Sequence, residues 1–141
     1  MSGTLIDTNI LVYVIDNQDA RKREACKREV DRLIASGQAV ISNQVLAELF
    51  SVLTSKIGIP LPSEEAARVV RGFAESPAIT KLTYTAETVV KAANLSAERR
   101  IPFWDALLAA TMLEAGVFTI CTEDEKDFSR VPGLKVVNPL Q

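Results

Sequence analysis

The amino-acid sequence predicts a single α/β domain, with a parallel sheet of four to five strands flanked by helices on both faces. Its 141 residues match the length of one domain, which is usually about 100–150 residues. With 48% hydrophobic and 24% charged residues, the chain has the composition of a globular protein. Short apolar runs alternate with helical patterns from end to end. This alternation is typical of parallel strands connected by crossover helices.

The expected helices in the first half of the chain are marked by residues that favour helix ends. Asp7-Thr8-Asn9 follows the first expected strand, and Ser42 with Asn43 follows the second, so each strand runs into helix-capping residues. Gly37 is a typical residue just past a helix end. We expect, in chain order, a strand at residues 4–6, helices at 10–15 and 19–36, a strand at 39–41, and helices at 44–56 and 63–73 with Ser63 as a cap.

The second half of the chain continues the same alternation. Pro102 precedes an apolar helix that Gly116 should stop. We expect a strand at residues 79–83, helices at 85–99 and 103–115, and strands at 117–121 and 135–137. Parallel sheets of this kind bind ligands beyond the carboxyl ends of their strands. Polar residues that follow the strands are therefore the first candidates for a functional site.

The chain contains no histidine, and this absence excludes several mechanisms. A Ser-His-Asp triad, a Cys-His pair and a Cys₂His₂ zinc site are all impossible. Cys26 and Cys121 are far apart in sequence and lack metal-binding spacing, so we expect two reduced, mostly buried thiols. Acid–base or metal chemistry must therefore fall to carboxylates, lysines or the two cysteines.

Four carboxylates stand where the predicted fold would bring them to one edge of the sheet. Asp7 directly follows the first strand, and Asp124 lies three residues after the fourth. Glu48 should emerge at the rim of the apolar face of its helix. Asp105 lies in the first turn of a helix that is apolar nearly all round, so it should be buried and needs a partner.

Each of these acids also has a purely structural interpretation. Asp7 could be only a helix cap, and Glu48 a solvated helix residue. Asp105 could pair with an arginine at 99–100, and Asp124 could belong to a solvated acidic loop. Convergence favours a shared role, because like charges packed together repel unless a cation joins them. Oxygen ligands alone favour Mg²⁺ or Mn²⁺ over zinc.

Four short motifs carry a resemblance to a known family. Each is weak alone, but their order and spacing together are specific: Leu5-Ile6-Asp7-Thr8-Asn9, Val45-Leu46-Ala47-Glu48-Leu49, Trp104-Asp105-Ala106-Leu107-Leu108-Ala109-Ala110 and Thr122-Glu123-Asp124-Glu125-Lys126-Asp127-Phe128. They resemble the PIN-domain family, and most of all its VapC-type toxins. The resemblance implies a single PIN domain over residues 1–141 with a Rossmann-like sheet.

The resemblance also implies an activity, a cofactor and partners. PIN proteins of this type are Mg²⁺- or Mn²⁺-dependent endoribonucleases that usually form homodimers, and a cognate VapB-type antitoxin inhibits them. The implied catalytic residues and metal ligands are Asp7, Glu48, Asp105 and Asp124. The implied supporting residues, which would act through hydrogen bonds, are Thr8, Asn9, Thr122 and Asp127. Asp127 is expected to form a structural corner first, and Trp104 to belong to the core.

These implications predict hydrolysis of RNA phosphodiesters by metal-activated water, as in the toxin of a type II toxin–antitoxin system. An aspartyl-phosphate phosphatase or phosphotransferase is an alternative. Its motif has a second aspartate two residues after the first, however, and this chain has Asn9 at that position. A non-catalytic RNA-binding protein is another.

The charge balance bears on the nucleic-acid partner. The net charge is −2, but setting aside the four proposed ligands leaves 16 basic against 14 acidic residues. The basic residues within 21–32 could form a phosphate-binding face, although a solvated helix fits the pattern better. The start of the chain lacks the basic stretch of a signal peptide, and no apolar run is long enough to span a bilayer. We therefore expect a cytoplasmic protein without membrane contact.

Overall fold

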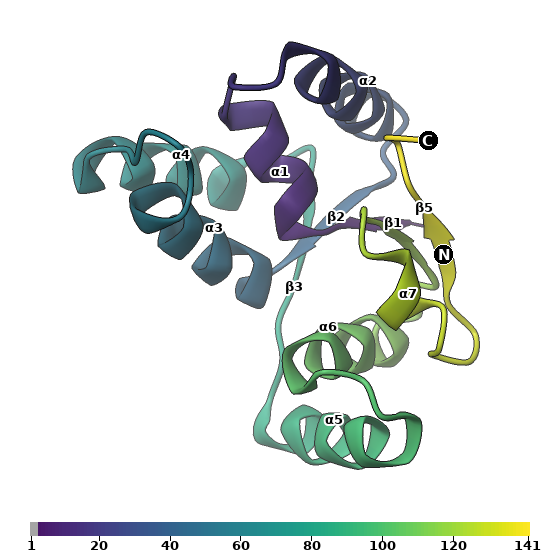
Figure 1. Ribbon diagram of the computed structural model, residues 1–141. Coiled ribbons are helices and arrows are strands. Elements are labelled where there is room, and N and C mark those ends of the chain that lie inside the picture. Colours follow the sequence, from purple (N-terminus) through teal and green to yellow (C-terminus); the bar gives the residue numbers. More distant parts are fainter. Residues whose placement is uncertain (1–2) are drawn as a thin grey trace.

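The computed structural model describes residues 3–141, whose strands form one five-stranded sheet (Figure 1). The strand order is β3-β2-β1-β4-β5, and every neighbouring pair is parallel. The strands are β1 (Thr4–Ile6), β2 (Ala39–Ser42), β3 (Thr80–Leu82), β4 (Thr119–Cys121) and β5 (Lys135–Val137). The predicted parallel sheet is therefore confirmed, at the upper end of the expected strand number.

Helices connect the strands and lie on both sides of the sheet. In Figure 1, α1 and α2 lie above the strands, and α5 and α6 lie below them. The helices are α1 (Thr8–Ile15), α2 (Ala20–Ala35), α3 (Asn43–Ser55), α4 (Ser63–Glu75), α5 (Ala86–Arg99), α6 (Phe103–Glu114) and α7 (Glu125–Phe128). Parallel strands require such crossovers, since a tight turn cannot join them.

The helix ends explain most small differences from the sequence prediction. Thr85 lies just outside α5 as its N-cap, although the prediction counted it as helical. Gly37 and Gly116 both have φ of +73°, the left-handed conformation that ends a helix. Ser63 is the first residue of α4 and not its cap, because Pro62 occupies the cap position and makes no side-chain bond. The short helix α7 was not predicted, because its acidic residues resemble a solvated loop.

Two hydrophobic clusters hold the layers together. The larger one joins β1, β2 and β4 to α1, α2 and α3, and the smaller one lies mainly between α5 and α6. Residues 106–112 of α6 are all buried, which confirms the prediction of a helix that is apolar nearly all round. The thiols of Cys26 and Cys121 are free and buried, as expected. None of the helices within residues 3–141 is long and apolar enough to cross a membrane.

The position of β1 determines where the functional site lies. The chain moves from β1 to β2 and β3 on one side, and later adds β4 and β5 on the other. The direction of winding therefore reverses between β1 and β4. At such a switch point the connections diverge and leave a crevice at the carboxyl ends of the strands.

Candidate functional site

Asp7 lies at this switch point, where β1 ends and α1 begins. Its Oδ1 accepts a hydrogen bond from the backbone N–H of Thr8, and its Oδ2 accepts one from the hydroxyl of Thr122, both at 2.8 Å. The register explains the second bond: Ile6 lies beside Cys121, so the following residues are also neighbours. Asp7 is thus the N-cap of α1, and its carboxylate is fixed on both sides.

The hydroxyl of Thr122 joins three parts of the site. While it donates to Asp7, it accepts a bond from the side-chain N–H of Asn9 at 3.3 Å and one from the backbone N–H of Asp124 at 3.0 Å. Thr122 is fully buried, so these partners satisfy its hydroxyl. Asn9 and Thr122 are therefore hydrogen-bonded to each other beside Asp7.

Glu48 approaches from α3 and is half-buried at the rim of that helix's apolar face, as predicted. Its Oε1 accepts a bond from the hydroxyl of Thr8 at 2.8 Å, and its Oε2 accepts one from the side-chain N–H of Gln44 at 3.3 Å. The same Gln44 nitrogen donates to the backbone carbonyl of Trp104 at 2.9 Å. Gln44 therefore connects α3 to the first turn of α6.

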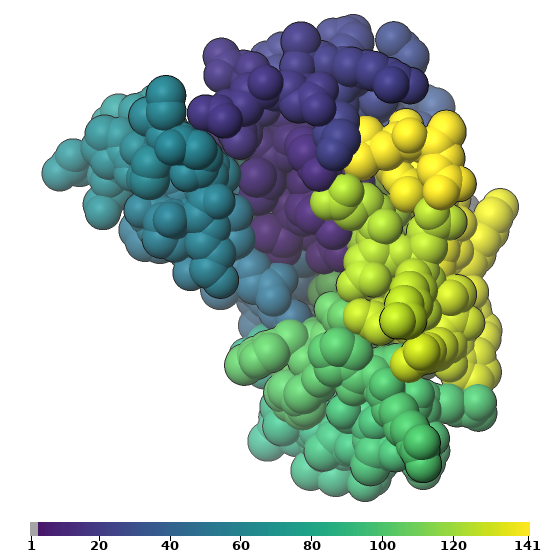
Figure 2. All heavy atoms as spheres, viewed as in Figure 1, coloured from purple at the N-terminus to yellow at the C-terminus, as the bar shows by residue number. Residues whose placement is uncertain are grey.

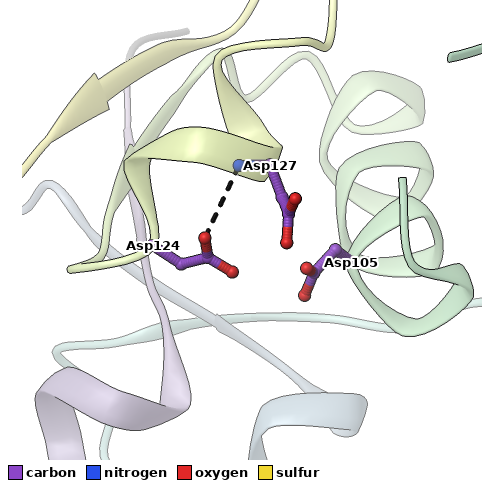
Figure 3. A group of neighbouring side chains, drawn as sticks. All are labelled: Asp105, Asp124 and Asp127. Carbon is purple, nitrogen blue, oxygen red and sulfur yellow. Dashed lines mark hydrogen bonds between the residues drawn. The ribbon is translucent and has the colours of Figure 1, made fainter. Parts of the chain in front are cut away.

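A cluster of three aspartates lies between α6 and α7. The carboxylates of Asp105, Asp124 and Asp127 point toward one another (Figure 3), and one oxygen of each lies within 4.8 Å of the other two. Asp124 caps α7 by accepting a bond from the backbone N–H of Asp127 at 3.5 Å. Asp127, which the sequence placed mainly in a structural corner, is therefore a full member of this cluster.

A cavity of about 530 Å³ unites these elements. Its lining includes Asp7, Glu48, Asp105 and Asp124, so all four predicted acids face one space. Figure 2 shows the purple α1 at the bottom of a hollow between the teal α3 and α4 and the green and yellow C-terminal segments. Lys56 contributes a basic side chain to the lining of this cavity.

The crowded acids have raised pKa values. Burial raises the pKa of Asp7 to about 6, although the bonds from Thr122 and Thr8 counteract part of this effect. Burial also raises the pKa of Asp105 to about 8, together with a hydrogen bond to Asp127 and repulsion from Asp124 and Asp7. The pKa of Asp124 is raised chiefly by burial and then by repulsion from Asp127. Without a cation, this arrangement therefore favours protonated carboxyls.

No basic side chain within residues 3–141 neutralises these acids. The ion pairs in that range are Lys27–Asp31, Arg32–Glu29 and Lys91–Glu114. The alternative in which Asp105 pairs with an arginine at 99–100 is therefore wrong. The first two pairs lie within α2, so the basic residues of 21–32 include some that are neutralised on their own helix.

The donor set suits a hard divalent cation. Carboxylate oxygens are the ligands that Mg²⁺ and Mn²⁺ prefer, and no histidine competes for another metal. A bound cation would favour the ionised carboxylates, whose pKa values are raised by burial and then by mutual repulsion. Asp105, Asp124 and Asp127 are close enough to share one ion, and Asp7 faces the same cavity.

Comparison with known proteins identifies the family. A model of the PIN domain matches residues 4–134, which is nearly the whole chain. The chain belongs to the PIN domain family. No curated protein matches this PIN domain.

Solved structures confirm a VapC-like fold for this PIN domain. It is similar to VapC20 of Mycobacterium tuberculosis, a toxin that cleaves the sarcin-ricin loop, with 25% identity, a TM-score of 0.72, and coverage of 94% of this chain and 97% of that one. VapBC2 of Rickettsia felis is 22% identical with a TM-score of 0.71 and 98% coverage of both chains. VapBC-1 of Haemophilus influenzae is 20% identical with a TM-score of 0.71 and full coverage of both.

Some residues of this PIN domain that contact the site were not found by sequence reasoning. Gln44 lies one helical turn before Glu48, and this i to i+4 spacing was a usable signal. The hydroxyl of Tyr13 donates to the carboxylate of Glu123 at 3.0 Å, which ties α1 to the loop after β4. No sequence signal links Tyr13 to Glu123, because the contact depends on how α1 lies over the sheet.

Proposed function

We propose that this protein is a divalent-metal-dependent endoribonuclease and the toxin of a type II toxin–antitoxin system. The observation that carries the proposal is the convergence of carboxylates from β1, α3, α6 and α7 on one open cavity. Membership of the PIN family and the likeness to VapC20 support an RNA substrate. Family membership also favours a nuclease over the phosphatase alternative.

We assign the cation to Asp7, Asp105 and Asp124, with Asp127 as a further ligand from the same cluster. Mg²⁺ or Mn²⁺ bound there would acidify water and stabilise negative charge on the phosphate. Thr122 and Thr8 hold Asp7 in place, so the cost of ordering this carboxylate is met when the chain folds.

Glu48 has a different role in this proposal. It lines the same cavity as Asp105 and Asp124, and Thr8 and Gln44 each donate to one of its oxygens. A carboxylate fixed in this way is suited to orient the attacking water and to accept its proton. Hydrolysis would then break the bond from phosphorus to the 3′ oxygen and leave 5′-phosphate and 3′-hydroxyl ends.

Charge at the cavity supports a phosphodiester substrate only when the cation is bound. Phosphate contacts supply much of the affinity of proteins for nucleic acids, and the metal-free cavity is strongly acidic. Lys56 lines the cavity on α3's side and is suited to contact a phosphate next to the scissile one. We therefore expect RNA to bind more weakly when the divalent cation is removed.

The proposal includes partners. One similar solved structure is a toxin–antitoxin complex from Klebsiella pneumoniae, and VapBC2 of Rickettsia felis is bound to a fragment of its promoter. By analogy we propose that a small VapB-type antitoxin binds this chain, that the chain forms a homodimer, and that both act in the cytoplasm. Co-expression with the adjacent small open reading frame and co-purification would test the antitoxin.

A cleavage assay tests the activity. The purified protein should cut RNA in the presence of Mg²⁺ or Mn²⁺ and lose activity with EDTA, while Asp7→Asn should be inactive. Asp31→Asn is the matched control, because Asp31 is an exposed acid paired with Lys27 on α2 and should not affect cleavage. Equal cleavage by wild type and Asp7→Asn would contradict the assignment.

A further inference from the structure

Trp104 does not belong to the core, contrary to the sequence prediction. Its residue surface is 59% exposed, although an indole is among the groups that gain most from burial. It directly precedes Asp105, which lines the acidic cavity, and follows Pro102 and Phe103 at the start of α6. An exposed aromatic side chain beside a candidate nuclease site requires an explanation other than folding.

The indole is held in a defined orientation although it is exposed. The ring of Phe103 meets it edge to face, with ring centres 5.3 Å apart and planes at 74°. The bond from Gln44 to the Trp104 carbonyl fixes the backbone at the same point. A ring fixed in this way loses little conformational freedom when a ligand packs against its open side.

A second cavity of about 440 Å³ lies beside this ring. Its lining residues are Asn43, Gln44, Ala47, Glu48, Ser51, Tyr84 and Trp104. Glu48 and Ser51 also line the acidic cavity, so the two spaces adjoin. A chain with a phosphate in the acidic cavity could therefore place an adjoining group here.

Gln44, which also lines this second cavity, has a buried acceptor without a partner. The residue is only 5% exposed, and its Oε1 has no hydrogen-bond partner among the residues that the structure describes. Both bonds of the Gln44 side chain use its nitrogen, so the carbonyl oxygen remains free to accept. A buried acceptor without a partner is unfavourable, and a ligand N–H group would satisfy it.

We propose that the cavity between Trp104 and Gln44 is a subsite for one unpaired nucleobase of the RNA substrate. The inference rests on the proposed nuclease function and names a specificity element of the same site. Proteins recognise single-stranded RNA by stacking its bases on aromatic rings and by hydrogen bonds to base edges. A planar base offers a face to the indole and N–H donors to Gln44. Stacking on one aromatic ring contributes about tenfold in affinity.

The single tryptophan makes the proposal directly measurable. In the inactive Asp7→Asn protein with Mg²⁺, intrinsic fluorescence arises from Trp104 as the sole indole. A single-stranded oligoribonucleotide should change this emission saturably and protect it from quenching by iodide. Anisotropy of the same oligonucleotide with a fluorescent label measures binding independently of Trp104.

Variants then separate the subsite from the proposed nuclease activity. Trp104→Ala should raise KM for RNA cleavage about tenfold with a small effect on kcat, and Trp104→Phe should recover most of the loss because it retains a stacking ring. Phe118→Ala is the matched control, since Phe118 is 51% exposed and directly precedes the amino end of β4, whereas the site lies at the carboxyl ends of the strands. Thermal unfolding checks that each variant is folded.

Several results would overturn the proposal. The wild type could cleave RNA while RNA leaves the Trp104 emission unchanged and Trp104→Ala leaves KM unchanged. In that case the nuclease function stands and the subsite fails. If the wild type with Mg²⁺ neither cleaves RNA nor binds the labelled oligonucleotide, the proposed nuclease function fails and the subsite fails with it. Emission that shifts with protein concentration but not with RNA would show that a second copy of the chain covers Trp104, which would also exclude the subsite.

Discussion

At the scale of single residues, the hydroxyl of Thr122 is the contact on which the site depends most. It is the buried group that links Asp7, Asn9 and the backbone of Asp124. A buried hydrogen bond to a charged group contributes more than one between neutral groups. The orientation of the Asp7 carboxylate therefore depends on Thr122, which is neither a proposed metal ligand nor a proposed catalytic residue.

Replacement of this hydroxyl tests that interpretation. Thr122→Val keeps the shape of the side chain but removes the donor that lowers the pKa of Asp7. We expect a loss of about 1–3 kcal/mol in the free energy of unfolding and weaker Mn²⁺ binding, measured by thermal unfolding and calorimetry. Thr54→Val is the control, because the Thr54 hydroxyl donates only to carbonyls of its own helix. Unchanged Mn²⁺ affinity in Thr122→Val would contradict the role.

Sequence reasoning located the four acids but not all the residues that hold them. Asp7 was predictable because it follows a strand, and Asp105 because an acid in an apolar helix needs a partner. Gln44 was not predicted to contact the site, and Trp104 was wrongly predicted to lie in the core. Both positions depend on how α3 packs beside the start of α6. Such packing is determined by tertiary contacts and not by local pattern.

At the scale of elements, the short helix α7 changes the interpretation of the acidic loop after β4. With Asp124 as its cap, α7 turns Asp127 back toward Asp105 on α6. Isolated helices this short are unstable, so α7 is maintained by its packing, in which Phe128 is fully buried. This is why the sequence pattern resembled a solvated loop and Asp127 was placed in a structural corner.

The role of α7 yields a prediction about Asp127. Asp127→Asn removes one charge from the cluster, and so should lower Mn²⁺ affinity about tenfold while stabilising the metal-free protein. Calorimetry and thermal unfolding with EDTA measure the two effects. Glu75→Gln, a substitution at the end of α4, is the control. A variant that binds Mn²⁺ as well as the wild type does would show that α7 does not contribute a ligand.

At the scale of the whole molecule, the sheet order explains why residues far apart in sequence meet. Because β1 lies between β2 and β4, the connections to α1, α3 and α7 all start from one edge. The sequence predicted the parallel sheet and the approximate residue ranges of its strands and helices, since alternation and helix caps are local signals. The strand order was not predicted, because it depends on contacts between elements.

The shared edge also makes stability depend on pH. The pKa values of Asp7 and Asp105 are raised to about 6 and about 8, so the folded metal-free protein holds protons that the unfolded chain has released. Its stability should therefore fall as pH rises from about 4 to 8, by at most about 3 kcal/mol for Asp7. Thermal unfolding in EDTA across this range measures the effect. The stability of Asp105→Asn should fall less steeply with pH than that of the wild type. An equally steep fall would contradict the raised pKa of Asp105.

Divalent cations should oppose this loss of stability at high pH. A bound ion favours ionised carboxylates, so Mg²⁺ should raise the unfolding temperature more at pH 8 than at pH 5, where protons compete for the same oxygens. An equal increase at both pH values would mean that the ion binds elsewhere.

The most direct measurement of the site is a calorimetric titration of the purified protein with Mn²⁺ at pH 8, with Asp105→Asn beside it. Saturable binding by the wild type and its loss in the variant is the predicted result. Binding of equal strength by both proteins, or none by the wild type, would contradict a metal centre built on the converging carboxylates.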